Sequence, residues 1–109
     1  MFRTTQKSKK NLLLCPIARV ADIIGDSYVV LIIRDLLESE KHFGDLKSSI
    51  KGISSRTLTN KLKLLEQQKF IVRKKIPGKP HYIEYSLTKK GKGLHKIIEE
   101  ARKYGEKFL

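Results

Sequence analysis

The chain has 109 residues and a formal net charge of +13 at pH 7, which predicts one small domain with a modest core. No apolar run approaches the roughly 18 residues of a membrane-spanning helix, so we expect no membrane association of that kind. The basic excess is concentrated between residues 41 and 90, which carry thirteen basic and three acidic residues. Such an excess indicates a polyanionic partner, although lysines also serve solubility.

The only cysteine, Cys15, excludes an intramolecular disulfide and fits a reducing, intracellular setting. The start of the chain is basic and then apolar, as in a signal peptide. However, its apolar run covers only residues 12–14, short of the roughly 7–15 residues of a signal core. Leu14 is also larger than the residue that processing before a cysteine requires. We therefore expect a cytoplasmic protein.

Residues 1–11 are polar, basic and without periodicity, which predicts a flexible arm. It is either a tail of no consequence or an arm that contacts phosphates or a minor groove. Residues 12–25 predict a helix, because Pro16 suits a first turn and Gly25 suits an end. Its apolar residues recur at helical spacing: Ile17, Val20, Ala21 and Ile24.

A second helix is predicted from Asp26 or Ser27 to Leu37, nearly all apolar and therefore central in the fold. Its β-branched residues also favour a strand, so the prediction depends on length and capping. Residues 38–41 are a polar connection. A short helix follows to about Ile50, and a tight turn at Gly52 leads into the next helix.

Residues 54–69 predict an amphipathic helix with two distinct faces. Leu58, Leu62 and Leu65 form a buried stripe. The other face has side chains of the types that read base edges and hold phosphates, although charge on a helix face is often only solvated. The predicted contact set is Ser54, Ser55, Arg56, Thr57, Thr59, Asn60 and Lys63. Two helices joined by a turn with Gly, the second basic outside, form the helix-turn-helix pattern.

Residues 70–88 change to strand spacing and predict a two-stranded β-hairpin. Pro77-Gly78-Lys79-Pro80 supplies its turn, and Ile83, Tyr85 and Leu87 alternate with polar residues. A hairpin directly after a base-reading helix is a wing, whose basic end would contact the DNA backbone or minor groove. The predicted wing contacts are Arg73, Lys74, Lys75, Lys79 and His81.

Thr88 is expected to cap a last helix over about residues 89–107. Its apolar side chains either pack on their own domain or join the first helix in a dimer interface. The predicted interface residues are Ile17, Val20, Ile24, Leu94, Ile97, Ile98, Ala101, Tyr104 and Phe108. A two-fold dimer would match a palindromic DNA site.

Nothing in the sequence indicates an enzyme, a metal site or a cofactor. His42, His81 and His95 lie on three different predicted elements, without a second ligand at helical spacing. There is no Gly-rich phosphate loop and no Ser-His-Asp order. Isolated acidic residues are interpreted as helix caps and surface charges.

Several segments resemble the HxlR-type winged helix-turn-helix transcriptional regulators between about Cys15 and Phe108. The matching segments are Cys15-Pro16 with Arg19, Gly25 to Leu37, His42-Phe43-Gly44-Asp45-Leu46, Gly52 to Glu66, and Glu84 to Gly91. Tyr28 and Ser27 replace the usual Trp and Lys of that family. Lys69 replaces the Gly expected after the long helix. Because positive φ costs a residue with a side chain roughly 1 kcal/mol, this helix end is expected to be built differently.

The resemblance implies a homodimer joined through its terminal helices, with two recognition helices in successive major grooves and wings flanking them. It also implies regulation of nearby genes. We further expect a nucleoid-associated protein whose effector is a small molecule or an oxidant. Some members of that family sense oxidants or electrophiles through a cysteine at the motif of Cys15. The alternative for Cys15 is a small, buried apolar side chain.

The sequence therefore predicts an α+β protein, mostly helical, with one winged helix-turn-helix domain over residues 12–109. Within it we place the helix-turn-helix at about 42–69, the wing at 70–88 and a dimerisation helix at 89–107. The predicted function is sequence-specific regulation of transcription on double-stranded DNA with a palindromic operator. The alternatives are a winged helix that binds RNA or packages nucleic acid without specificity, and one that binds an acidic protein.

Overall fold

The computed structural model describes residues 13–109, so the arm expected over residues 1–11 lies outside the described residues. In chain order the elements are α2 (Pro16–Ile24), α3 (Ser27–Glu38), β1 (Lys41–His42), α4 (Phe43–Ser49), α5 (Ser55–Gln67), β2 (Ile71–Ile76), β3 (Lys79–Leu87), α6 (Lys89–Lys92) and α7 (His95–Phe108). Within residues 13–109, no helix has the length and apolar character needed to cross a bilayer.

The first two predicted helices are confirmed. Pro16 opens α2, which ends at Gly25. Asp26 caps α3, since its carboxylate accepts hydrogen bonds from the backbone N–H groups of Tyr28 (2.9 Å) and Val29 (3.1 Å). This cap favours a helix over the strand that the β-branched residues of α3 also permit.

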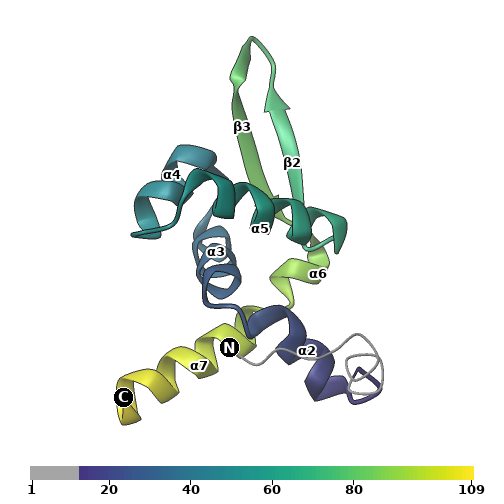
Figure 1. The fold of residues 1–109 in the computed structure, drawn as a ribbon, viewed down its shortest axis with the longest axis vertical. Coiled ribbons are helices and arrows are strands. Elements are labelled where there is room, and N and C mark those ends of the chain that lie inside the picture. Colours follow the sequence, from purple (N-terminus) through teal and green to yellow (C-terminus); the bar gives the residue numbers. More distant parts are fainter. Residues whose placement is uncertain (1–12) are drawn as a thin grey trace.

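Helix α3 lies at the centre of the molecule, between the pair α4–α5 on one side and α2 and α7 on the other (Figure 1). The buried apolar residues are Val29, Ile32, Ile33, Leu36, Leu46, Ile50, Ile53, Leu58, Leu62, Leu65, Phe70, Ile71, Tyr85, Leu87, Leu94 and Ile98. One acid, Asp35, is buried with them and accepts a hydrogen bond from the Arg34 Nε at 3.0 Å. The central position predicted for α3 is confirmed.

The sheet contains the predicted hairpin and a third strand, β1, that was not predicted, since Lys41 was expected in a polar connection and His42 at the start of the short helix. Its strand order is β1-β3-β2, all antiparallel, with Lys41 opposite Tyr85. Ile76 pairs with Lys79, so the turn consists only of Pro77 and Gly78. Gly78 has φ +78°, a conformation that glycine adopts without strain. Lys79 therefore belongs to β3 rather than to the turn.

The single helix predicted over residues 89–107 is wrong in one respect, because it is divided into α6 and α7. Thr88 caps α6 as expected, its hydroxyl accepting from the Gly91 N–H at 3.2 Å. A Cβ at Gly91 would lie 2.3 Å from the Phe70 carbonyl oxygen, so only glycine lets α6 pack this closely on the backbone of Phe70. The Leu94 N–H then donates to the Gly91 carbonyl at 3.1 Å, a three-residue spacing that tightens the turn before α7.

The end of α5 differs from the expectation based on Lys69. The N–H groups of Phe70 and Lys69 donate to the carbonyls of Leu65 (2.9 Å) and Glu66 (3.0 Å), the bonds of a Schellman motif. Lys69 has φ +64°. The helix therefore ends in the left-handed conformation that glycine usually adopts at this position. Lys69 adopts this conformation, which strains a residue with a side chain.

We predict that Lys69→Gly raises the free energy of unfolding by about 1 kcal/mol, because glycine removes the left-handed strain. Urea unfolding followed by circular dichroism measures the change. Gln67→Gly, in the last turn of the same helix, is the control and should lower stability by about 1 kcal/mol. A Lys69→Gly variant that is no more stable than the wild type would show that the backbone of Lys69 is not strained.

Candidate functional site

Helix α5 has the two faces that its sequence predicts. Leu58, Leu62 and Leu65 are buried, whereas the polar residues of the other face are exposed or half-buried. The exposed ones are Ser54, Ser55, Arg56, Asn60 and Lys63, and the half-buried ones are Thr57 and Thr59. The structure thus presents the predicted polar face of α5 to solvent.

The start of α5 is held by a side-chain cap. The Ser54 hydroxyl accepts a hydrogen bond from the Thr57 N–H (3.0 Å) and donates to the Thr57 Oγ1 (3.0 Å). Ser54 and Thr57 therefore orient the first turn, while Ser55 and Arg56 between them are exposed. The free backbone N–H groups of such a turn attract anions.

The hairpin stands beside α5 and projects from the body of the molecule (Figure 1). Its predicted contact residues Arg73, Lys74, Lys75, Lys79 and His81 are all exposed. Arg73 and Thr59 line the same groove, of about 560 Å³, between α4, α5 and the hairpin. His81, a second predicted hairpin contact, lines it as well, so the structure brings residues of both predicted contact sets to a common hollow surface.

Two residues in this region were missed by the sequence analysis. His42 of β1 places its Nδ1 3.3 Å from the Ile83 carbonyl oxygen, and its ring packs edge-on against Tyr82 at 5.5 Å. Tyr82 is 54% exposed, and the Lys79 ammonium lies 5.6 Å from its ring centre. An aromatic residue among basic ones on the hairpin was the available signal, since bases and sugars pack on such rings.

The half-buried Lys61 of α5 contacts the start of α3 and does not line the groove. Its ammonium forms an ion pair and a hydrogen bond with the Asp26 carboxylate at the start of α3. Burial by itself raises the pKa of Asp26. The hydrogen bond from Lys61, its positive charge and the N–H groups of Val29 and Tyr28 outweigh burial and lower the pKa of Asp26 below its ordinary value.

We predict that Asp26→Asn lowers the free energy of unfolding by about 1–2 kcal/mol at neutral pH, because it removes the charge from a hydrogen-bonded pair. A lowered pKa means that the carboxylate stabilises the fold above its ordinary pKa of about 4, and that this contribution is lost as the pH falls through the lowered value. The difference from the wild type should therefore shrink below about pH 4.

Urea unfolding at a series of pH values measures this difference. Glu106→Gln, which changes an exposed carboxylate of α7, is the matched control and should leave stability nearly unchanged at neutral pH. A stability difference for Asp26→Asn that stays constant down to pH 2 would show that charge is not its cause.

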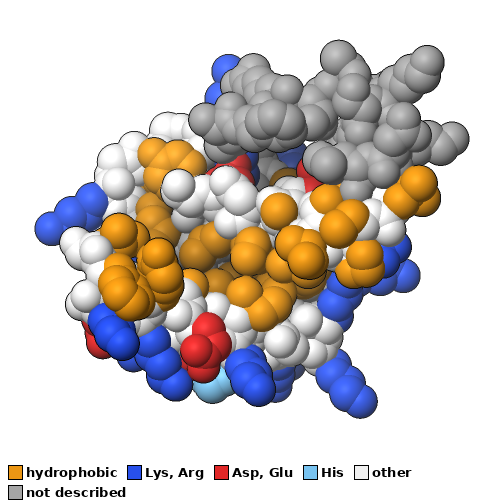
Figure 2. Space-filling view, turned by 90° about the horizontal axis from the view of Figure 1, so that it is seen from below, with side chains coloured by type: hydrophobic (Ala, Val, Ile, Leu, Met, Phe, Trp, Pro, Cys, Tyr) orange, Lys and Arg blue, Asp and Glu red, His pale blue; other side chains and the backbone are white. Residues whose placement is uncertain are grey.

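Apolar side chains gather on the face formed by α2 and α7 (Figure 2). Ile17 is 78% exposed, Tyr104 60% and Phe108 61%. Ile97 and Ala101 are exposed, and Val20 and Ile24 are half-buried. The prediction that Leu94 and Ile98 belong to the interface is corrected here, because both are buried in the core of their own chain.

Cys15 is exposed at the start of α2. The alternative of a small, buried apolar side chain is therefore wrong. His42, His81 and His95 lie on β1, β3 and α7. Within residues 13–109, no group of three or more His, Cys, Asp or Glu side chains is placed to hold a metal ion.

A helix-turn-helix followed by a β-hairpin defines a winged helix-turn-helix protein, and this class is the fold of the chain. The family model described as HxlR-like helix-turn-helix matches residues 23–109. The chain belongs to this family, as its motifs suggested. It is therefore a helix-turn-helix transcriptional regulator, and its relatives are regulators rather than enzymes.

One relative is the uncharacterized HTH-type transcriptional regulator YvaP of Bacillus subtilis. The two are 35% identical over 97 residues, which cover 88% of this chain and 90% of YvaP. A solved regulator of Porphyromonas gingivalis, described as of the MarR family, aligns over 100% of both chains with a TM-score of 0.82 and 30% identity.

The reduced form of the regulator YodB from Bacillus subtilis is also similar, with a TM-score of 0.75 and 31% identity over 87% of this chain and 94% of YodB. YodB has also been solved after diamide treatment and with quinone bound. These forms belong to YodB.

Proposed function

We propose that this regulator binds a specific sequence of double-stranded DNA as a homodimer, with α5 in the major groove. The observation that carries the proposal is the shared groove, where α5 and the basic hairpin meet at Thr59 and Arg73. A convex helix beside a projecting basic hairpin fits a major groove and the backbone next to it. The domain is proposed to span residues 12–109, as the sequence predicts.

Each residue of the two predicted contact sets has a proposed role. Arg56 and Asn60 read base edges, since Arg pairs with guanine and Asn with adenine in two-point contacts. Ser55, Thr59 and Lys63 contact phosphates or base edges, and Ser54 with Thr57 orients the first turn towards a phosphate. The hairpin residues Arg73, Lys74, Lys75, Lys79 and His81 contact the flanking backbone.

The alternative is a winged helix that binds RNA or packages nucleic acid without specificity. Such binding requires positive charge only. The face of α5 also carries an amide and hydroxyl groups, which favours base reading. The two functions differ in the ratio of affinities for specific and random DNA.

We predict that the wild type prefers DNA from its own gene neighbourhood over random DNA by about 10³-fold or more. Arg56→Ala with Lys63→Ala should weaken specific binding by at least about tenfold, because each base contact contributes roughly 1–3 kcal/mol. Fluorescence anisotropy titrations at two salt concentrations measure both quantities.

Lys92→Ala, an exposed lysine of α6 outside the groove, is the control and should change affinity little. A preference below about tenfold would support the non-specific alternative. Specific binding that the double variant leaves unchanged would contradict the assignment of α5 to the major groove.

The homodimer is proposed to form through α2 and α7. Their exposed apolar residues make a continuous face (Figure 2), and the Tyr104 and Phe108 rings pack on each other at 4.9 Å. Exposed apolar patches of this kind mark interaction surfaces. A two-fold axis through this face would place two α5 helices in successive major grooves, about 34 Å apart on a palindromic operator.

We predict that Tyr104→Glu with Phe108→Glu converts the dimer into a monomer, since it places two charges in the apolar face. Sedimentation velocity measures the association state. Lys96→Glu changes the charge of another exposed α7 residue and should leave the dimer intact. A wild type that sediments only as a monomer would contradict the dimer itself.

Cys15 is proposed to react with the effector of this regulator. The diamide-treated and quinone-bound forms of YodB and the exposure of Cys15 support this role. Its thiolate would add to a ring carbon of a quinone to form a C–S bond, while the electron pair of the C=C bond moves to the ring oxygens, which take up protons to give a hydroquinone thioether. With diamide, two Cys15 thiols from two chains would form a disulfide while diamide takes up the two hydrogens.

We predict that diamide or a quinone changes the DNA affinity of the wild type but not that of Cys15→Ser. Mass spectrometry of the treated protein identifies the adduct or the disulfide. Treated wild type with a modified Cys15 and unchanged DNA affinity would contradict a sensor role.

A further inference from the structure

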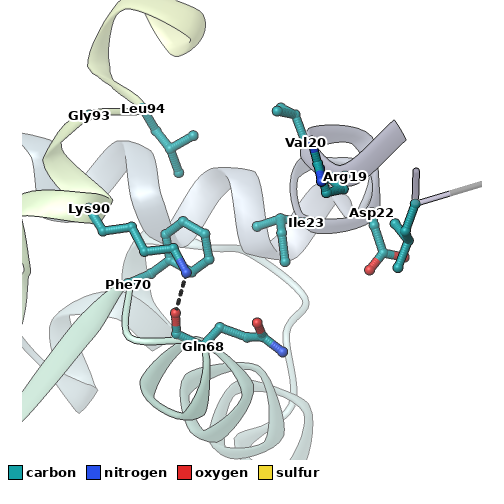
Figure 3. A pocket seen from close by; sticks show the side chains of 10 residues that line it. Arg19, Val20, Asp22, Ile23, Gln68, Phe70, Lys90, Gly93 and Leu94 are labelled. Carbon is teal, nitrogen blue, oxygen red and sulfur yellow. Dashed lines mark hydrogen bonds between the residues drawn. The ribbon is translucent and has the colours of Figure 1, made fainter. Parts of the chain in front are cut away.

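A cavity of about 580 Å³ separates α2 from the end of α5 and from α6 (Figure 3). Its apolar lining consists of Leu13, Val20, Ile23, Phe70 and Leu94. Ile23 and Leu94 point into this space from opposite sides, with the Phe70 ring between them (Figure 3). The volume lies within the range of about 300–1,000 Å³ that small-molecule sites occupy.

A positive charge stands at the edge of this apolar space. The Lys90 ammonium donates to the Gln68 carbonyl oxygen at 2.8 Å and lies 4.3 Å from the centre of the Phe70 ring. The carbonyl and the ring that hold it are uncharged, so an anion would be a stronger partner. Arg19 also lines the cavity, and Asp22 is the one acid among its described lining residues, so these residues together carry a net positive charge.

We propose that this cavity binds a small carboxylic acid with an apolar body. The carboxylate pairs with Lys90, and the apolar body fills the space between Ile23 and Leu94. Aliphatic and aromatic acids share this chemistry, which requires one negative charge and a compact apolar part. The site is distinct from Cys15, which does not line the cavity.

Lys90 also connects the cavity to the end of α5. The Lys90 ammonium bonds the carbonyl of Gln68, the residue that ends α5. A carboxylate that pairs with the Lys90 ammonium would replace its hydrogen bond to the Gln68 carbonyl. The apolar body of the ligand would fill the gap between α2 and α5. Ligand binding is therefore expected to change the affinity of α5 for DNA, a step that rests on the proposed function.

The test uses the full chain with four probes: octanoate and 1-naphthoate, and their uncharged counterparts octanamide and 1-naphthamide. Methyl NMR follows the resonances of Ile23 and Leu94 during titration. Both residues should shift saturably with at least one carboxylate, and its amide should bind at least about tenfold more weakly. The tighter of the two acids distinguishes an aliphatic from an aromatic ligand.

Lys90→Met retains the apolar stem of the side chain and should weaken carboxylate binding by at least about tenfold. Lys89→Met, the exposed neighbour on α6, is the matched control and should bind like the wild type. Circular dichroism of both variants verifies the fold. Amides that bind as tightly as acids, equal binding by Lys90→Met, or no saturable shift at Ile23 and Leu94 would each overturn the proposal.

DNA affinity measured with and without the acid separates the two proposals. Protein that binds the acid but never binds specific DNA would overturn the proposed function and leave the ligand site standing. Protein that binds specific DNA but not the acid would overturn only the ligand site.

Discussion

The turn Gln68–Phe70 is the constraint on which the position of the hairpin depends. The Lys69 carbonyl accepts from the Thr88 hydroxyl at 2.7 Å, and the Phe70 carbonyl accepts from the Thr88 N–H at 3.0 Å. Gly91 leaves room for the same Phe70 carbonyl, since a Cβ there would lie 2.3 Å from it. Both ends of the hairpin are thus tied to the end of α5. The angle between helix and hairpin, and therefore the shape of the groove, follows from this junction.

Some basic side chains hold elements of the fold together, whereas others are exposed to solvent. Lys61 uses its charge to hold α5 on the start of α3 through Asp26, and Lys90 uses its charge at the end of α5. Arg56, Lys63 and the hairpin residues extend into solvent. Because the first two anchor the middle and the end of α5 to the body, the exposed residues are presented on a helix of defined orientation.

Helix α2 connects the proposed regulatory features. Ile17 is exposed on the apolar face, Ile23 lines the cavity, and Cys15 lies at the start of the helix. A change in the position of α2 would therefore affect the proposed dimer and the cavity together. Asp26, two residues after the end of α2, caps α3 and links that helix to α5 through Lys61.

The local features of this protein were determined by its sequence. The spacing of Leu58, Leu62 and Leu65, the helix starts near Asp26 and Ser54, the cap at Thr88 and the two strands around Pro77-Gly78 were all predicted and are all present. Each depends on residues within a few positions of one another, where side-chain spacing and backbone preference act directly.

Other features were decided only by the tertiary structure, because they join residues that are distant in the chain. The two-residue strand β1 has no pattern of its own and exists because Tyr85 and Glu84 lie beside it. Lys61 finds its partner 35 residues away. Leu94 and Ile98 belong to the core rather than to the predicted interface, because they pack with buried residues from other elements of the fold. Local spacing carries no information on such contacts, which depend on how the whole chain packs.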